Sequence, residues 1–147
     1  MKASLGRRQK GAAAIEFALV FVMFFAVFYG LLGFSLPLLM VQSFNQASSE
    51  AVRRCVALDP SSGTYAADVQ ATAKAVLEQQ LSWMSGPLKF QVAADANINL
   101  TAANLLTVTI NYDKAKLTAV IPVLNLPLIG EVPRIPAKLG AQASLQL

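Results

Sequence analysis

Two groups near the N-terminus could do chemistry together: a peptide bond open to proteolysis and a carboxylate beyond it. Cleavage between Gly11 and Ala12 would make Ala12 the N-terminus and Glu16 the fifth residue of the mature chain. Residues four apart share a helix face, so the new amine and the Glu16 carboxylate would lie close within one chain or meet between neighbours.

Pairing of Glu16 with an amine would offset the free-energy cost of an unpaired acid deep in a membrane, about 2.5–3.5 kcal/mol. Alternatively, Glu16 lies at the lipid headgroups, where a carboxylate near a helix N-terminus is mildly favourable. Position alone leaves both open.

The remaining residues offer little catalytic chemistry. There is no histidine and one cysteine, so a Ser-His-Asp set, a Cys-His pair and a usual zinc site are excluded. The acidic residues of the C-terminal part are scattered, and no glycine-rich phosphate loop follows a strand. Asp113 and Lys114 are interpreted as a solvated turn. We therefore expect no enzymatic activity, no cofactor and no metal.

The lone cysteine, Cys55, is interpreted as a small apolar residue packed on a helix face. It cannot form a disulfide within the chain. In an oxidising compartment it would be free or bonded to another chain.

The element that must position Glu16 is a 25-residue run from Phe17 to Val41, without charge and with Ser35 as its one clearly polar residue. As a helix it would be roughly 37 Å long, enough to cross a hydrocarbon core of about 30 Å with some tilt. Four basic residues precede the run, and the other eight balance the eight acidic ones. The positive-inside rule therefore predicts a cytoplasmic N-terminus and a C-terminal domain in the periplasm or outside. Nucleic-acid binding is not expected, because no basic face remains.

Four residues of the run are candidates for helix packing. Ala26 and Gly30 form a small-xxx-small pair, and Gly33 adds a third small residue nearby. Pro37 removes a backbone hydrogen bond and is expected to bend the helix axis.

Residues 42–147 predict a small α+β domain. The first helix is expected to continue over 42–58, and a second helix over 64–85 is expected to begin with Thr64 as its N-cap. The apolar period then changes from about 3.6 to 2, which indicates an antiparallel sheet of three or four strands. The expected strands lie at about 88–94, 105–113 and 138–147. Frequent prolines predict an ordered, apolar-lined loop over 117–136.

The basic leader with Arg7-Arg8, then Gly11 and Ala-Ala-Ala-Ile-Glu-Phe before a long apolar helix, resembles the N-terminal signal of type IV pilin-like proteins. More narrowly, it is similar to the TadE-like pseudopilins (minor pilins) of the tight-adherence, or Tad/Flp, system. The resemblance covers residues 7 to about 57. It is looser at Thr107-Val108-Thr109 and at residues 126–130.

The resemblance implies a pilin-like fold with a cytoplasmic prepilin leader, residues 1–11, and a transmembrane and assembly helix, residues 12–41. It implies cleavage between Gly11 and Ala12 by a membrane prepilin peptidase. Glu16, followed by Phe17, would be the residue for subunit entry into the fibre. The implied partners are that peptidase, other pilins or pseudopilins, the inner-membrane assembly platform and membrane lipid.

The implied function is initiation, capping or assembly of a tight-adherence pilus used for surface attachment and biofilm formation, from a single-span inner-membrane protein. The soluble domain favours a minor component over the shorter major pilins. The alternative is an uncleaved single-span protein whose soluble domain binds another envelope protein. A secreted protein with an ordinary signal peptide fits poorly, because the apolar run is far longer than the expected stretch of about 7–15 residues.

Overall fold

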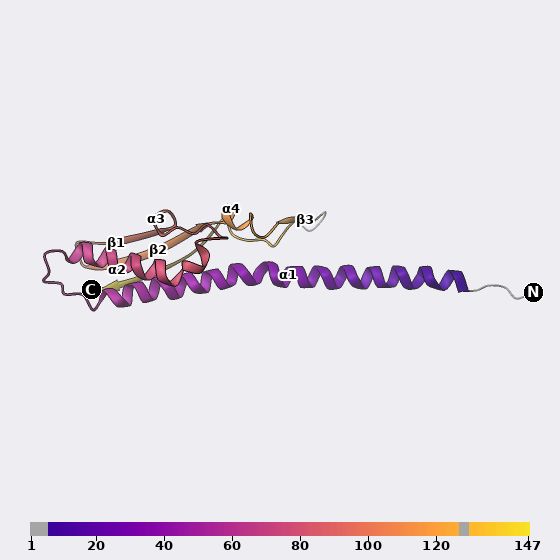
Figure 1. Ribbon diagram of the computed structural model, residues 1–147, viewed down its shortest axis with the longest axis horizontal. Helices are drawn as coiled ribbons and strands as arrows, with labels where there is room; N and C mark the ends of the chain where they lie inside the picture. Colours follow the sequence, from indigo (N-terminus) through magenta and orange to yellow (C-terminus); the bar gives the residue numbers. More distant parts are fainter. Residues whose placement is uncertain (1–5, 127–129) are drawn as a thin grey trace, which may run out of the picture.

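The computed structural model describes residues 6–126 and 130–147 of the chain. Residues 1–5 of the expected leader and residues 127–129 of the proline-rich loop therefore lie outside the described part. One long helix, α1 (Gly6–Cys55), carries a small α+β domain on its C-terminal half, and its N-terminal half extends away from that domain (Figure 1). The predicted α+β class is confirmed.

Helix α1 continues without interruption through Pro37 and past the apolar run to Cys55. The predicted continuation beyond Val41 is therefore confirmed, three residues shorter than expected. Arg53 and Arg54 lie in its last turn, where positive charge is favourable beside the exposed carbonyl groups of a helix C-terminus.

The predicted second helix is confirmed as α2 (Tyr65–Gln80), followed by a 3₁₀ turn, η1 (Ser82–Met84). Thr64 occupies the N-cap position, but its side chain accepts no backbone hydrogen bond. Its hydroxyl instead donates to the Asp68 carboxylate at 2.7 Å. The expected capping contact is therefore replaced by a side-chain contact one turn on.

The main sheet has three antiparallel strands in the order β1 (Ala96–Leu100), β2 (Leu105–Asp113), β5 (Lys138–Gln146). Strands β2 and β5 confirm two of the three predicted strands. Along β2 the alternation predicted from the sequence is realised, because every second side chain is fully buried. These side chains are Leu106, Val108, Ile110 and Tyr112.

The predicted strand at 88–94 is wrong. Leu88 and Phe90 are buried as their alternation suggested, but they lie in an irregular segment that ends in a one-turn helix, α3 (Val92–Asp95). Lys89 between them has a φ of +52°, which is incompatible with an extended strand. The first strand, β1, forms instead between the expected strands at 88–94 and 105–113, where pairing with β2 satisfies its backbone.

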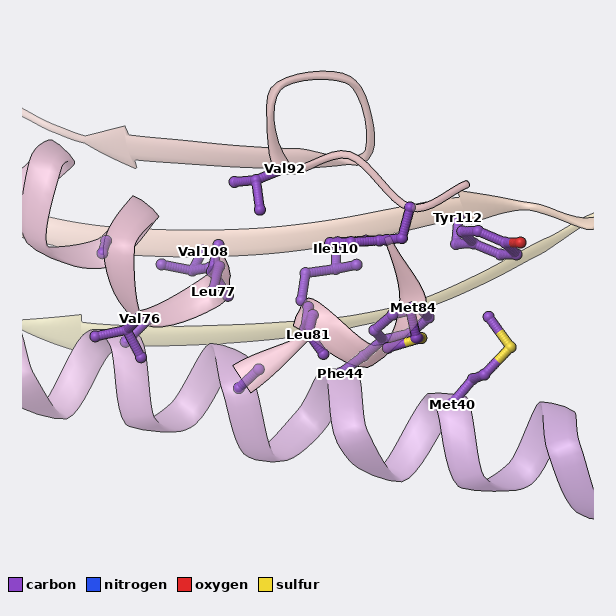
Figure 2. Packing of buried hydrophobic residues seen from close by; sticks show 14 of the residues in the cluster. Met40, Phe44, Val76, Leu77, Leu81, Met84, Val92, Val108, Ile110 and Tyr112 are labelled. Carbon is purple, nitrogen blue, oxygen red and sulfur yellow. The ribbon is translucent and has the colours of Figure 1, made fainter. Parts of the chain in front are cut away.

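The hydrophobic core lies between the sheet, α2 and the C-terminal half of α1 (Figure 2). The rings of Phe44 from α1, Phe90 and Tyr112 from β2 pack against one another within it, with centroids 5.7–6.4 Å apart. Helix α1 contributes a buried stripe at helical spacing: Met40, Phe44, Ala47, Ala51 and Cys55. The membrane-type helix and the domain therefore share one core.

The proline-rich loop is mostly irregular, as predicted, but it contains two short paired strands that the prolines did not suggest. A one-turn helix, α4 (Lys114–Leu117), precedes it, and β3 (Leu124–Leu126) pairs with β4 (Gly130–Val132) within it. We call the described residues 118–126 and 130–136 the arm. The arm lies alongside α1 and reaches farther towards its N-terminal half than any other described part of the domain (Figure 1).

Candidate functional site

The candidate site is the free N-terminal half of α1. Every residue from Gly11 to Phe28 is exposed, so the described part of the domain covers none of this stretch. Its surface is largely apolar, with five phenylalanines between Phe17 and Phe28. A bare apolar rod of this length fits a lipid or protein environment far better than water.

The predicted processing bond, between Gly11 and Ala12, lies inside α1 near its start. A Cβ added at Gly11 would meet nothing within 4 Å, so packing within the chain does not require a glycine there. A protease that binds its substrate extended would need the first turns of α1 to unwind. The bond joins the sixth and seventh residues of α1, so about two helical turns would have to open.

The side chain of Glu16 is exposed on α1, one turn beyond Ala12 and on the same face. Among residues 11–125 and 130–147, whose side chains the structure describes, it makes no hydrogen bond or ion pair. The geometry predicted for an amine at Ala12 and the Glu16 carboxylate is therefore available within a single helix.

Phe17 begins a row of aromatic rings along α1. Phe17, Phe21, Phe25 and Tyr29 are spaced by four residues, and successive ring centroids lie 6.0, 6.2 and 6.3 Å apart. The row ends under the arm, where the Tyr29 hydroxyl donates a hydrogen bond to the backbone carbonyl of Pro122. The aromatic surface beside Glu16 is thus continuous with the point where the domain first meets the helix.

The four candidate packing residues occupy two different environments. Ala26 and Gly30 line a shallow apolar depression on α1 together with Phe34. Gly33 and Pro37 are instead buried beneath the domain. A Cβ on Gly33 would lie 3.2–3.5 Å from three carbons of the Pro133 ring. The absence of a side chain at Gly33 therefore lets the arm pack closely against α1. Only Ala26 and Gly30 remain open to another helix.

At the other end of α1 lies a small charged cluster. The Glu50 carboxylate accepts hydrogen bonds from Arg53, at 2.5 and 2.9 Å, and from Arg54 at 2.8 Å. The hydrogen bonds from Arg54 and then Arg53 hold the pKa of Glu50 below its usual value. All three groups are satisfied by one another, which indicates a helix-end ion-pair network with a structural role.

Cys55 is buried on the face of α1 that meets α2, as its position predicted. Burial raises the pKa of its thiol, and the thiol lies 3.5 Å from the Val69 carbonyl oxygen. A thiol in this setting is a poor nucleophile. Within the described ranges, no three His, Cys, Asp or Glu side chains gather at a spacing that could hold a metal ion.

The fold and this site define a class of protein: one apolar helix that could span a membrane, with an α+β domain built onto its C-terminal half. Residues 11–53 match the model of the family described as TadE-like protein, so the resemblance to TadE-like proteins is confirmed over this segment. The matched segment contains the exposed half of α1 and most of its buried stripe. Searches of curated proteins and of solved structures found no significant match.

No pattern in the sequence indicates the contacts between the arm and α1. Tyr29 is the one ring of the aromatic row with a hydrogen-bonding group, and Gly33 follows it by one turn. These two residues were visible in the sequence. Their partners, Pro122 and Pro133, lie about a hundred positions away, and only the folded chain brings them together.

Proposed function

We propose that this chain is a minor pilin or pseudopilin that takes part in the assembly, initiation or capping of a tight-adherence (Tad/Flp) pilus. The TadE-like match over residues 11–53 supports an association with the Tad pilus. The observation that carries the finer proposal is the exposed Glu16 on a bare apolar helix, without a partner among residues 11–125 and 130–147 and five positions after a glycine that packing does not require. The protein acts by assembly and not by catalysis.

In this proposal α1 spans the inner membrane with its N-terminus in the cytoplasm. A prepilin peptidase cuts after Gly11, which leaves Ala12 as the N-terminus. The Glu16 carboxylate then pairs with the terminal amine of a neighbouring subunit, and this contact aligns the helices during assembly. The domain is displayed on the periplasmic or extracellular side, and the pilus serves surface attachment and biofilm formation.

Processing is tested by sequencing the N-terminus of the protein purified from its host membranes. We expect Ala-Ala-Ala-Ile-Glu from the natural chain and the full leader from a Gly11→Val variant. Gly6→Val is the matched control, since it changes a leader glycine away from the bond. An intact leader in natural protein from cells that possess the peptidase would contradict the proposal and favour the uncleaved single-span protein.

The assembly role is tested with Glu16→Leu. Removing the only carboxylate of the apolar half should leave membrane insertion intact, because insertion of a more apolar helix is favourable. It should also reduce piliation and surface attachment strongly, as counted by electron microscopy and adhesion assays. Glu78→Leu, on an exposed face of α2, is the matched control. Normal pili in the Glu16 variant would remove the role assigned to this side chain.

A further inference from the structure

The arm is attached to α1 at two points inside the apolar run. The hydroxyl of Tyr29 donates to the Pro122 carbonyl, and the Pro133 ring packs on Gly33. These contacts hold the arm beside residues 29–33 of α1. The arm therefore lies at the same height along the helix as the middle of the run from Phe17 to Val41.

This position limits where the hydrocarbon core can end. The arm contains three prolines, and its strands β3 and β4 pair only with each other within the described ranges, so each leaves an open backbone edge. Unpaired backbone groups are not tolerated in lipid. A hydrocarbon core centred on the whole run would immerse the arm. The hydrocarbon core of the membrane must therefore end near Tyr29.

The free half of α1 fits a hydrocarbon core bounded in this way. Gly11 to Phe28 is 18 residues, all exposed. This stretch is roughly 27 Å long as a helix, close to the hydrocarbon thickness of about 30 Å. Tyr29 then lies at the headgroups, the usual place for an amphipathic ring. Relative to a span that ends at Val41, the membrane moves about 20 Å towards the N-terminus.

We propose that the arm is a membrane-contact element that rests on the phospholipid headgroups on the domain side and so sets the depth of α1. This inference rests on the proposed membrane-spanning role of α1. Val120 and Leu124 are apolar and remain 43% and 39% exposed, respectively, so they can enter the boundary between headgroups and acyl chains. Arg134 is exposed beside the β3–β4 pair, with its guanidinium near Gly130, and suits a lipid phosphate.

The face of α1 away from the arm stays apolar beyond Tyr29. Leu31, Phe34 and Leu38 are exposed there. Leu31 lies near the inferred boundary, so a tilt of about 20°, which is normal for membrane helices, would bring it only to the junction of headgroups and acyl chains while the arm stays at the headgroups. Glu16 would then lie about 7–8 Å inside the opposite boundary of the hydrocarbon core, where a carboxylate most needs a partner.

The test measures depth in the full chain, reconstituted in vesicles of phosphatidylethanolamine and phosphatidylglycerol. Cys55→Ala removes the natural thiol, and near-UV circular dichroism checks that the fold is retained. A fluorophore is then placed on a cysteine introduced at one site per variant: Val20→Cys, Leu31→Cys, Leu124→Cys or Gln70→Cys. Quenching is compared between lipids with a nitroxide at the headgroup and lipids with one at the middle of the acyl chain.

We expect the Val20 label to lose most fluorescence with the mid-chain nitroxide, and the Leu31 and Leu124 labels with the headgroup nitroxide. The Gln70 label, on α2, should lose none. A Leu31 label quenched best at mid-chain would overturn the inferred boundary, and an unquenched Leu124 label would overturn the arm contact. In both cases a deep Val20 label would leave the proposed membrane span standing. Val20 and Leu31 labels that are both unquenched would refute the span itself, and the inference with it.

Discussion

At the residue scale, Tyr112 shows how the core places a polar group. Its ring is fully buried between α1 and the sheet, and its hydroxyl donates to the Leu88 carbonyl at 2.6 Å. The same bond holds the irregular segment that contains Leu88 and Phe90 against the sheet. A buried side chain that also ties down a loop is a sensitive position for substitution.

Tyr112→Phe should therefore lower the free energy of unfolding by about 1–2 kcal/mol, because the Leu88 carbonyl keeps its burial and loses its donor. The measurement is chemical denaturation of the full chain in detergent at neutral pH. Tyr65→Phe is the matched control, because the Tyr65 hydroxyl has no hydrogen-bond partner in the described ranges. An equal loss in both variants would show that the bond to Leu88 is not responsible.

Tyr112 also predicts a pH dependence. Burial, and then the charges of Asp95 and Asp113, raises its pKa from the ordinary 10 to about 12. The folded chain therefore holds this proton at pH values where the unfolded chain has lost it. Stability should be retained below pH 10 and fall as the pH rises from 10 to 12. Tyr112→Phe should show a shallower fall over that range in thermal melts, and an unchanged slope would contradict the assignment.

At the element scale, the arm and α1 depend on each other through Gly33. Its missing side chain leaves room for the Pro133 ring, whereas a Cβ at Gly30, one turn earlier, would meet nothing within 4 Å. The two glycines thus form a natural pair of test and control positions in one helix. Both gain the same helix propensity on substitution, so a difference between them reports the contact.

Gly33→Leu should displace the arm from α1, because its side chain would occupy the place of the Pro133 ring. We expect faster proteolytic cleavage within 118–136 and a lower melting temperature. Gly30→Leu should cause neither change. Similar cleavage of the two variants would show that the arm is not held at Gly33.

At the scale of the whole molecule, the helix and the domain are one folding unit. The stripe from Met40 to Cys55 is buried against α2 and the sheet, so α1 contributes a wall of the core (Figure 2). Opposite it, the half from Gly11 to Phe28 is left free for lipid and partners. The C-terminal half of α1 thus stabilises the domain, and its N-terminal half is free for the proposed membrane and assembly roles.

A fragment of residues 29–147 should therefore fold, whereas a fragment of residues 56–147 should not. The shorter fragment lacks the stripe of α1 and would expose the core faces of α2 and β2 to water. Dispersed amide signals in nuclear magnetic resonance spectra would be expected only for the longer fragment. A folded shorter fragment would show that α2 and the sheet are sufficient without α1.

Local patterns were enough to predict α1 from its long apolar run, and α2, β2 and β5 from the apolar period that each carries. They failed at 88–94, where Leu88 and Phe90 alternate but Lys89 turns the backbone away from a strand. They also failed at β1, although Ile98 and Leu100 alternate with asparagines and are half-buried; the strand pairs with β2. Burial alone does not decide whether a short apolar alternation becomes a strand.

The sequence by itself determined the long apolar helix, the Gly11–Glu16 spacing and the TadE-like match over residues 11–53, since each depends on residues close together in the chain. Only the tertiary structure decided how much of that helix is free. It buries Gly33 under Pro133 and ties Tyr29 to Pro122, contacts between residues about a hundred positions apart. A hydropathy profile reports only how apolar the residues of a segment are. It cannot distinguish a helix face covered by lipid from one covered by the arm of the same chain.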